Sequence, residues 1–196
     1  LVKQDVGTLL LTGSNIYIGG TTVSAGTLQL GNGGITGSVA TNVAVASGAT
    51  LAIDRSNTII YGGVISGAGR FVQQGSGTTV LTGTNTYTGG TTITAGTLQV
   101  GNGGTAGSIT GNVNNSGTLA FNRSNTYTFG GAVSGSGALA QQGTGTTVLT
   151  GTNTYTGGTT VSNGTLQLGN GGTTGTIAGN VAVGSGATLA VNRSNT

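Results

Sequence analysis

The stretch that decides the fold is L-T-G-S-N-I-Y-I-G-G-T-T at residues 11–22, because the chain repeats it twice with few changes. Both later copies read L-T-G-T-N-T-Y-T-G-G-T-T, and they occupy positions 81–92 and 149–160. Two further phrases follow the same repeat: G-N-G-G begins at positions 31, 101 and 169, and R-S-N-T begins at positions 55, 123 and 193. A nearly fixed period of this kind indicates stacked copies of one unit rather than a single globule.

Each long unit divides into shorter phrases that contain a large apolar residue and alternate with a period of two. In residues 26–30, Leu28 and Leu30 share one side of an extended strand, whereas Thr27 and Gln29 share the other. Such phrases recur along the whole chain, and their apolar anchors are Leu28, Leu51, Phe71, Leu98, Leu119, Leu139, Leu166 and Leu189. The alternation predicts strands that bury one face.

The same burial is expected in every copy, because one inward position is apolar in all three as Ile53, Phe121 and Val191. Apolar residues are never sustained at helical spacing, and Gly, Thr, Asn and Ser fill the gaps between strands. The sequence therefore predicts an all-β chain, a parallel β-helix or β-solenoid of about eight coils of 20–27 residues. We expect residues 1–196 to form a single solenoid segment excised from a longer repeat protein, with long units starting near positions 11, 81 and 149.

Charged side chains are scarce: five are Lys or Arg and two are Asp among 196 residues, whereas a soluble domain is about a quarter charged. Disorder is not favoured, because apolar residues recur in register. The arginines at 55, 123 and 193 are expected three coils apart, or about 14 Å, which exceeds the Debye length of about 8 Å in physiological salt. They form no phosphate track, so no nucleic-acid partner is predicted.

The sequence contains few features that indicate a cellular compartment. The sequence has no Cys, so nothing in it depends on a redox compartment. No run of apolar residues approaches the length of a membrane span, and the chain does not open with a signal-peptide pattern. We expect no membrane insertion of this segment.

Three sets of polar or small residues recur and are candidates for ligand contacts, but a structural role is favoured for each. Recurrent asparagines are expected in left-handed or Asx-turn corners, Gly-Gly pairs in tight turns, and tyrosines in packing rather than as a sugar platform. The sets are Asn15, Asn85 and Asn153; the pairs that begin at Gly19, Gly89 and Gly157; and Tyr17, Tyr87 and Tyr155.

The arginines that follow the strands are the other candidates. Arg55, Arg123 and Arg193 each come after an Asp or Asn at a strand end, where a guanidinium can bind corner carbonyls or contact acidic glycans. Binding to corner carbonyls, or solvation, is the favoured interpretation. Arg70 has no counterpart, since Ala138 occupies its position in the next copy, and we expect it on a solvated face.

The sequence contains few side chains that could act in catalysis or bind a metal ion. The sequence has no His and no Cys, so it contains neither a Ser-His nor a Cys-His nucleophile. The two carboxylate side chains, Asp5 and Asp54, are expected about two coils apart, too far for a glycosidase pair, and stacked calcium sites need an acid in every repeat. We predict no catalytic, cofactor-binding or metal-binding residues, and no cofactor.

The long motif resembles a known family. Residues 1–28, followed by residues 77–98 and 145–166, look like the passenger-associated transport repeat of bacterial autotransporters, also called the autotransporter-associated β-strand repeat. The resemblance covers somewhat under half of the chain directly. It implies a right-handed parallel β-helix that is exported through a C-terminal outer-membrane β-barrel, lying outside this chain, and displayed at or released from a Gram-negative surface.

By resemblance, the predicted function is that of a non-catalytic structural segment of a secreted passenger, supporting secretion and folding and acting as a surface stalk. An adhesin or self-assembling fibre segment, associating end to end or laterally, is the alternative, with self or a host surface glycan as partner. A Thr-rich ice-binding solenoid is a third reading, based on Thr-x-Thr at residues 84–86 and 152–154.

Overall fold

The computed structural model describes residues 1–194, and Asn195 and Thr196, which complete the third R-S-N-T phrase, lie outside them. The described chain contains short strands and no helix. Its strands are β1 (Val2–Lys3), β2 (Thr8–Leu11), β3 (Ser14–Asn15), β4 (Thr21–Val23), β5 (Thr27–Leu30), β6 (Ser38–Val39), β7 (Val43–Val45), β8 (Thr50–Ile53), β9 (Ile59–Tyr61), β10 (Ile65–Ser66), β11 (Arg70–Gln73), β12 (Thr78–Leu81), β13 (Thr91–Ile93), β14 (Thr97–Val100), β15 (Val113–Asn115), β16 (Thr118–Phe121), β17 (Tyr127–Phe129), β18 (Val133–Ser134), β19 (Ala138–Gln141), β20 (Thr146–Leu149), β21 (Thr159–Val161), β22 (Thr165–Leu168), β23 (Val181–Val183) and β24 (Thr188–Val191).

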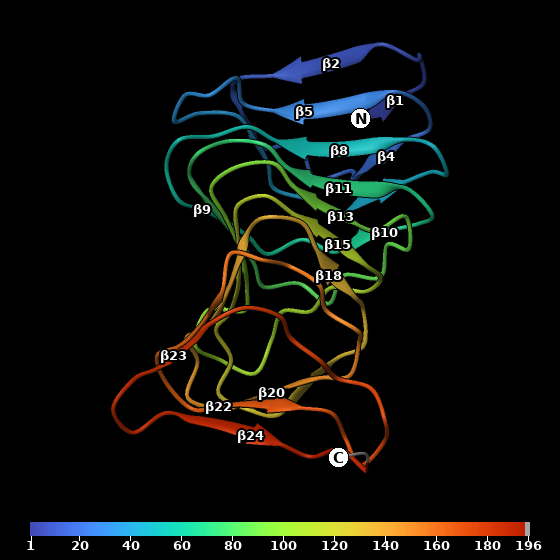
Figure 1. The fold of residues 1–196 in the computed structure, drawn as a ribbon. Coiled ribbons are helices and arrows are strands. Elements are labelled where there is room, and N and C mark those ends of the chain that lie inside the picture. The colour runs from blue at the N-terminus through green and yellow to red at the C-terminus, as the bar shows by residue number, and fades with distance from the viewer. Residues whose placement is uncertain (195–196) are drawn as a thin grey trace.

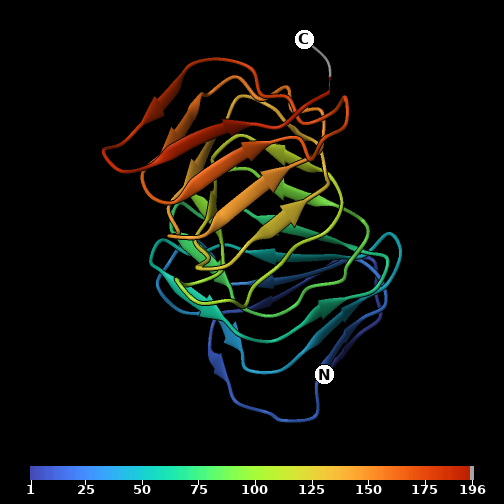
Figure 2. The same ribbon diagram turned by 90° about the horizontal axis from the view of Figure 1, so that it is seen from below.

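The chain winds into a parallel β-solenoid of about ten turns, near the predicted eight, and this confirms the predicted fold class. Every strand pairs in parallel with strands of the preceding or following turn, as the stacked ribbons of Figure 1 and the turned view of Figure 2 show. Successive strands along the chain visit three faces in a fixed order. The first face carries β1-β4-β7-β10 and then β17-β20-β22-β24, the second carries β2-β5-β8-β11-β13-β15-β18, and the third carries β3-β6 and then β9-β12-β14-β16-β19-β21-β23.

The predicted stacking of the first anchors is confirmed. Leu9, Leu28, Leu51 and Phe71 are direct neighbours on the second face, in four successive turns. All but Leu9 are fully buried. Apolar residues of one column thus pack along the axis, so each turn covers the core of the next.

The eight anchors lie in three columns, one on each face. Phe71 pairs with Thr91 in the next turn rather than with the next anchor, Leu98. Leu98, Leu119 and Leu139 stack on the third face, and Leu166 pairs with Leu189 on the first face. The two longest spacings between anchors, from Phe71 to Leu98 and from Leu139 to Leu166, therefore connect residues on different faces. One turn of the solenoid contains fewer residues than either spacing.

The long repeat does not contain a whole number of turns. The equivalent strands β2, β12 and β20 lie on the second, third and first faces, and the same shift by one face holds for β5, β14 and β22. Ten strand positions make one long repeat and three make one turn, so a repeat spans three and a third turns. Each copy is therefore rotated by one face relative to the copy before it.

The interior is one continuous apolar column. Inward side chains such as Leu51, Leu98 and Leu149 are fully buried, and Phe121 packs its ring against Tyr127 and Phe129 with centroids 5.9 and 5.7 Å apart. Val191, at the position that Phe121 occupies one copy earlier, is 69% exposed, so the prediction of burial fails there. Within the described residues, β24 pairs with a strand on one side only, and that strand is β22.

Candidate binding surface

The recurrent asparagines join adjacent turns, and two of them, Asn85 and Asn153, are buried. Asn85 Nδ2 donates to the carbonyls of Gly83 (3.0 Å) and Ser108 (2.9 Å), and its Oδ1 accepts from the Ile65 backbone N–H (2.8 Å). Because Ile65 lies one turn before Asn85 and Ser108 one turn after it, a single side chain bonds three turns together.

The other copies follow the same plan. Asn153 bonds the turns before and after it through Val133 and Thr176 (2.9 and 2.7 Å), and Asn15 reaches Ser38 at 3.0 Å. A structural role is therefore supported over a ligand contact. The expected left-handed conformation is wrong, because within residues 1–194 only glycines have positive φ. The physical reason is that the asparagine closes a hydrogen-bond ladder rather than a corner.

The tight turns fall on the Gly-Gly pairs, as predicted. Their second glycines, Gly20, Gly90 and Gly158, have φ values of +74°, +80° and +81°. A side chain at such a φ is strained, so these positions favour glycine for a conformational reason. Nothing in the turn geometry resembles a phosphate cradle at a helix N-terminus, since the described chain has no helix.

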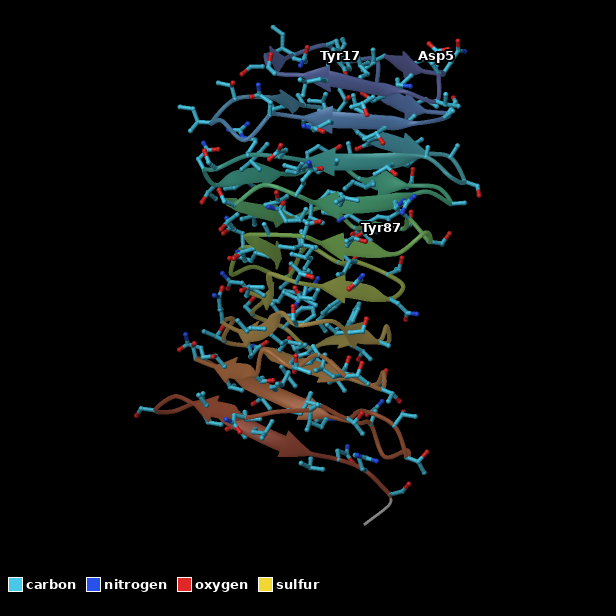
Figure 3. The ribbon with its side chains drawn as sticks, turned by 45° about the horizontal axis from the view of Figure 1, so that its top comes forward. Asp5, Tyr17 and Tyr87 are labelled. Carbon is cyan, nitrogen blue, oxygen red and sulfur yellow. The ribbon has the colours of Figure 1, made fainter. Side chains whose placement is uncertain are left out.

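The recurrent tyrosines belong to the interior. Tyr87 and Tyr155 are fully buried, and their hydroxyls lie 2.6 and 2.5 Å from the hydroxyls of Thr91 and Thr159. Tyr17 is half-buried and bonds Thr21 in the same way (2.7 Å). Figure 3 places Tyr17 towards the N-terminal end of the stack and Tyr87 further along it. The favoured packing role is supported, because a buried ring offers no platform to a sugar.

Burial makes these phenols poor acids. Loss of hydration raises the pKa of Tyr87 well above its usual range, although its hydrogen bond to Thr91 opposes the rise. Loss of hydration also raises the pKa of the buried phenols of Tyr61 and Tyr155 and of the partly buried phenol of Tyr127. The charged phenolate is disfavoured because little water reaches it.

We expect the solenoid to lose stability at alkaline pH. A phenol whose folded-state pKa is raised contributes stability that is fully present below its unfolded value of about 10 and is lost as pH rises through the folded value. Phenolate absorbance of the buried tyrosines should appear together with the loss of β circular dichroism, and Tyr87→Phe should weaken the pH dependence. Ionisation of all the tyrosines with the strands intact would contradict this.

The side chains of Arg55, Arg123 and Arg193 donate hydrogen bonds to surface loops. Arg55 donates to the carbonyls of Ile35 and Gly37, the second at 2.9 Å, and its Nε donates to Asn57 Oδ1 at 3.0 Å. Arg123 repeats this arrangement on the Thr105 and Gly107 carbonyls, and Arg193 donates to the Thr173 carbonyl at 2.8 Å. Each guanidinium thus holds the G-N-G-G loop of the preceding turn, and the prediction of corner binding is supported.

Arg123 is the most enclosed of the three. It is 9% exposed, and its guanidinium carbon lies 4.8 Å from the centroid of the Tyr127 ring, within the range of a cation–π contact. The predicted spacing of three coils is close to the three and a third turns of one repeat, and the extra third of a turn carries the three arginines to different faces. Arg70 is exposed as predicted, and its Nε donates to Thr50 Oγ1 at 3.1 Å.

A buried polar position in the core was missed. Lys3, Gln73 and Gln141 are equivalent and no more than 7% exposed. Lys3 Nζ donates to the carbonyls of Asp5 and Ala25, whereas Gln73 Nε2 donates to the Gly75 carbonyl at 2.8 Å. The signal was present in the period-two pattern, because each residue follows an inward apolar position by two residues and therefore points inward as well.

Acidic groups do not gather. Asp5 precedes β2 and Asp54 follows β8, which stacks two turns after β2, so the predicted separation is confirmed. In Figure 3 Asp5 lies at the N-terminal end of the stack. Residues 1–194 contain no group of three or more His, Cys, Asp or Glu side chains placed to hold a metal ion. The same residues include no helix that is long and apolar enough to cross a bilayer.

The Thr-x-Thr phrases do not form one rank. Thr84 bridges to Ser108 on the first face, and Thr152 bridges to Thr176 on the second. Asn85 and Asn153, between the threonines, are buried. An ice-binding surface requires ranks of threonine on one flat face, so this arrangement does not support the third reading.

Comparison with known proteins supports the family suggested by the motifs. Residues 1–30, 71–100 and 139–168 match the family described as passenger-associated-transport-repeat. The "Adhesin BmaC autotransporter" of Brucella suis biovar 1 (strain 1330) is 43% identical over 160 residues, which cover 72% of this chain. The chain carries passenger-associated transport repeats of the autotransporter type.

These passenger repeats place the segment in a secreted protein at the extracellular or outer-membrane surface of a Gram-negative bacterium, as predicted. The matched segment is only 5% of the length of the Brucella relative. No solved structure matches the passenger segment.

Proposed function

We propose that this passenger segment is a non-catalytic structural stalk that supports the export and folding of the protein to which it belongs. The observation that carries this proposal is the parallel stacking of the turns, in which every strand of the described chain pairs with a strand of the turn before it, of the turn after it, or of both. The contacts that stabilise a turn therefore come from its neighbours, which is the property of a solenoid that grows by addition.

Growth by addition suits export of an unfolded chain. A turn that has already folded outside the cell presents strand edges, and the next turn pairs with them as it emerges. The buried asparagines extend this pairing to side chains, since Asn85 bonds both neighbouring turns. Each added turn also buries apolar residues, so folding hinders return of the chain into the pore.

The composition fits the same route. The sequence has no Cys, so no disulfide can lock it before it crosses a membrane, and it has only seven residues with formal charge to desolvate. The export partner that we infer is a C-terminal outer-membrane barrel of the same polypeptide, outside this chain. The scarcity of acids and the lack of His and Cys support a non-catalytic role.

Gln99→Pro tests the folding step. Gln99 lies on β14, which pairs with β12 on one side and β16 on the other, and proline both lacks the N–H for a ladder bond and distorts an interior strand. With the segment expressed ahead of an autotransporter barrel, we expect the amount accessible to protease on intact cells to fall severalfold.

Gln99→Ala is the matched control, because it shortens the same half-buried side chain and keeps the backbone N–H. It should reach the surface at the wild-type level. If the proline variant were displayed as well as the alanine variant, coil-by-coil folding would not be what supports export.

Adhesion is the second proposal, because the Brucella relative is named an adhesin. Beads coated with the purified segment should then bind host cells better than beads coated with an unrelated β-solenoid. Equal binding of the two kinds of bead would contradict adhesion by this segment, and it would be consistent with the stalk role. The rotation of successive copies around the axis argues against lateral fibres, because like surfaces of neighbouring repeats face different directions.

A further inference from the structure

Four Asn-Gly dipeptides occur in the sequence, and all four asparagines are exposed: Asn32-Gly33, Asn102-Gly103, Asn163-Gly164 and Asn170-Gly171. Such pairs are prone to spontaneous deamidation, because glycine has no side chain to hinder ring closure. The glycine nitrogen attacks the side-chain amide carbon, forming a C–N bond and a cyclic imide and releasing ammonia. Water then opens the imide to aspartate or isoaspartate.

Ring closure requires that the glycine nitrogen give up its proton and approach the side chain. In three of the pairs this N–H is engaged with the next turn. Gly33, Gly103 and Gly171 donate to the carbonyls of residues 54, 122 and 192 at 2.9, 2.8 and 2.8 Å. Attack by any of these nitrogens must first break a bond between turns.

The loops that contain these three pairs are also held from the other side. Arg123 donates to the carbonyls of Thr105 and Gly107, and the Ser124 N–H donates to the Gly104 carbonyl at 2.9 Å. The loop around Asn102 is therefore fixed at several points after the reactive pair. This restraint opposes the change of backbone conformation that ring closure needs.

The pair Asn163-Gly164 lies elsewhere, in the turn between β21 and β22. Within residues 1–194 the Gly164 N–H makes no hydrogen bond, and Asn163 Nδ2 makes only a long one, 3.3 Å, to the Gln142 carbonyl. The other two copies have Ala25 and Ala95 at the position of Asn163, so only the third copy places a reactive pair in this turn.

We propose that Asn163 is a spontaneous deamidation site, and that the loops clipped by arginine protect the other three Asn-Gly pairs. Conversion to isoaspartate adds a methylene to the backbone next to Gly164. That glycine lies tightly against the preceding turn, where an added Cβ would be 2.3 Å from the Gly145 carbonyl oxygen. Its own carbonyl accepts from the Thr188 N–H at 2.9 Å. Ageing of the protein would therefore loosen the contact between turns at this place.

The test is incubation of the purified segment at mildly alkaline pH, with peptide mapping by mass spectrometry over time. Asn163 should convert at least about tenfold faster than Asn102, a factor that the net free energy of one or two hydrogen bonds supplies. Conversion of Asn102 as fast as Asn163 would overturn the proposal.

Two variants separate local structure from sequence. Ala95→Asn builds an Asn-Gly pair in the equivalent turn of the second copy, and the introduced asparagine should deamidate at a rate close to that of Asn163. Arg123→Ala should speed conversion of Asn102 and leave Asn163 unchanged, whereas the control Arg70→Ala should alter neither. Slow conversion in the Ala95→Asn variant, or an Asn102 rate unaffected by loss of Arg123, contradicts the proposed protection.

Hydrogen exchange of the unmodified protein gives a readout that does not depend on folding of the variants. The Gly103 N–H should exchange much more slowly than the Gly164 N–H, because only the first is bonded within the described chain. Equal exchange would remove the physical basis of the proposal.

Discussion

Replacing Phe121 with alanine is expected to lower the free energy of unfolding by about 3–5 kcal/mol, the range for a large aromatic residue lost from a packed core. Phe121 is fully buried, and its ring packs against those of Tyr127 and Phe129. The neighbouring turns constrain both partners, so the cavity cannot collapse fully. Urea unfolding followed by far-ultraviolet circular dichroism measures the loss.

Val191→Ala is the matched control, because Val191 holds the same position of the repeat but is 69% exposed. Its expected effect is within about 0.5 kcal/mol, as for most surface substitutions. Similar losses in the two variants would mean that the position, rather than the packed aromatic cluster, sets the stability.

Asn85→Ala is expected to destabilise the chain by about 2–6 kcal/mol, because one buried polar group left without a partner costs about 1–3 kcal/mol and each of the two other hydrogen bonds lost costs about 0.5–1.5 kcal/mol. The substitution leaves the Ile65 N–H without a partner and removes the side-chain hydrogen bonds to the carbonyls of Gly83 and Ser108, which still accept from the backbone N–H groups of Ser108 and residue 85. Since these groups belong to three successive turns, limited proteolysis should detect opening on both sides of the mutation. The free energy of unfolding is again measured in urea.

Asn15→Ala provides the comparison for this second prediction. Asn15 is half-buried, and its two side-chain hydrogen bonds reach only the Gly13 and Ser38 carbonyls. We expect a loss near 1 kcal/mol, about that of an exposed polar contact. If Asn85→Ala cost no more than this, the asparagine would not be joining three turns.

Much of the fold could be predicted because alternation of apolar residues reports directly which side of a strand is buried. Leu28, Leu51 and Phe71 stack as the period-two pattern indicates. The arginine contacts to loop carbonyls and the packing of Tyr87 were also anticipated from residue type and repeat position. The same period-two alternation also predicts that Lys3 points into the core, where the structure places it, although this residue was not among the predicted core positions.

The sequence by itself determined an all-β chain of stacked parallel turns, a core of Leu, Val and Ile, and the lack of the His and Cys side chains on which nucleophilic catalysis commonly depends. Only the tertiary structure decided that each long repeat makes three and a third turns, so that Leu28, Leu98 and Leu166 lie on three different faces. The reason is that the sequence shows only how many residues one repeat contains, whereas the number of turns per repeat depends on where the corners between strands form. Those corners form at glycines with positive φ, such as Gly90, and are held by hydrogen bonds between turns, such as those from Arg123 to the carbonyls of Thr105 and Gly107.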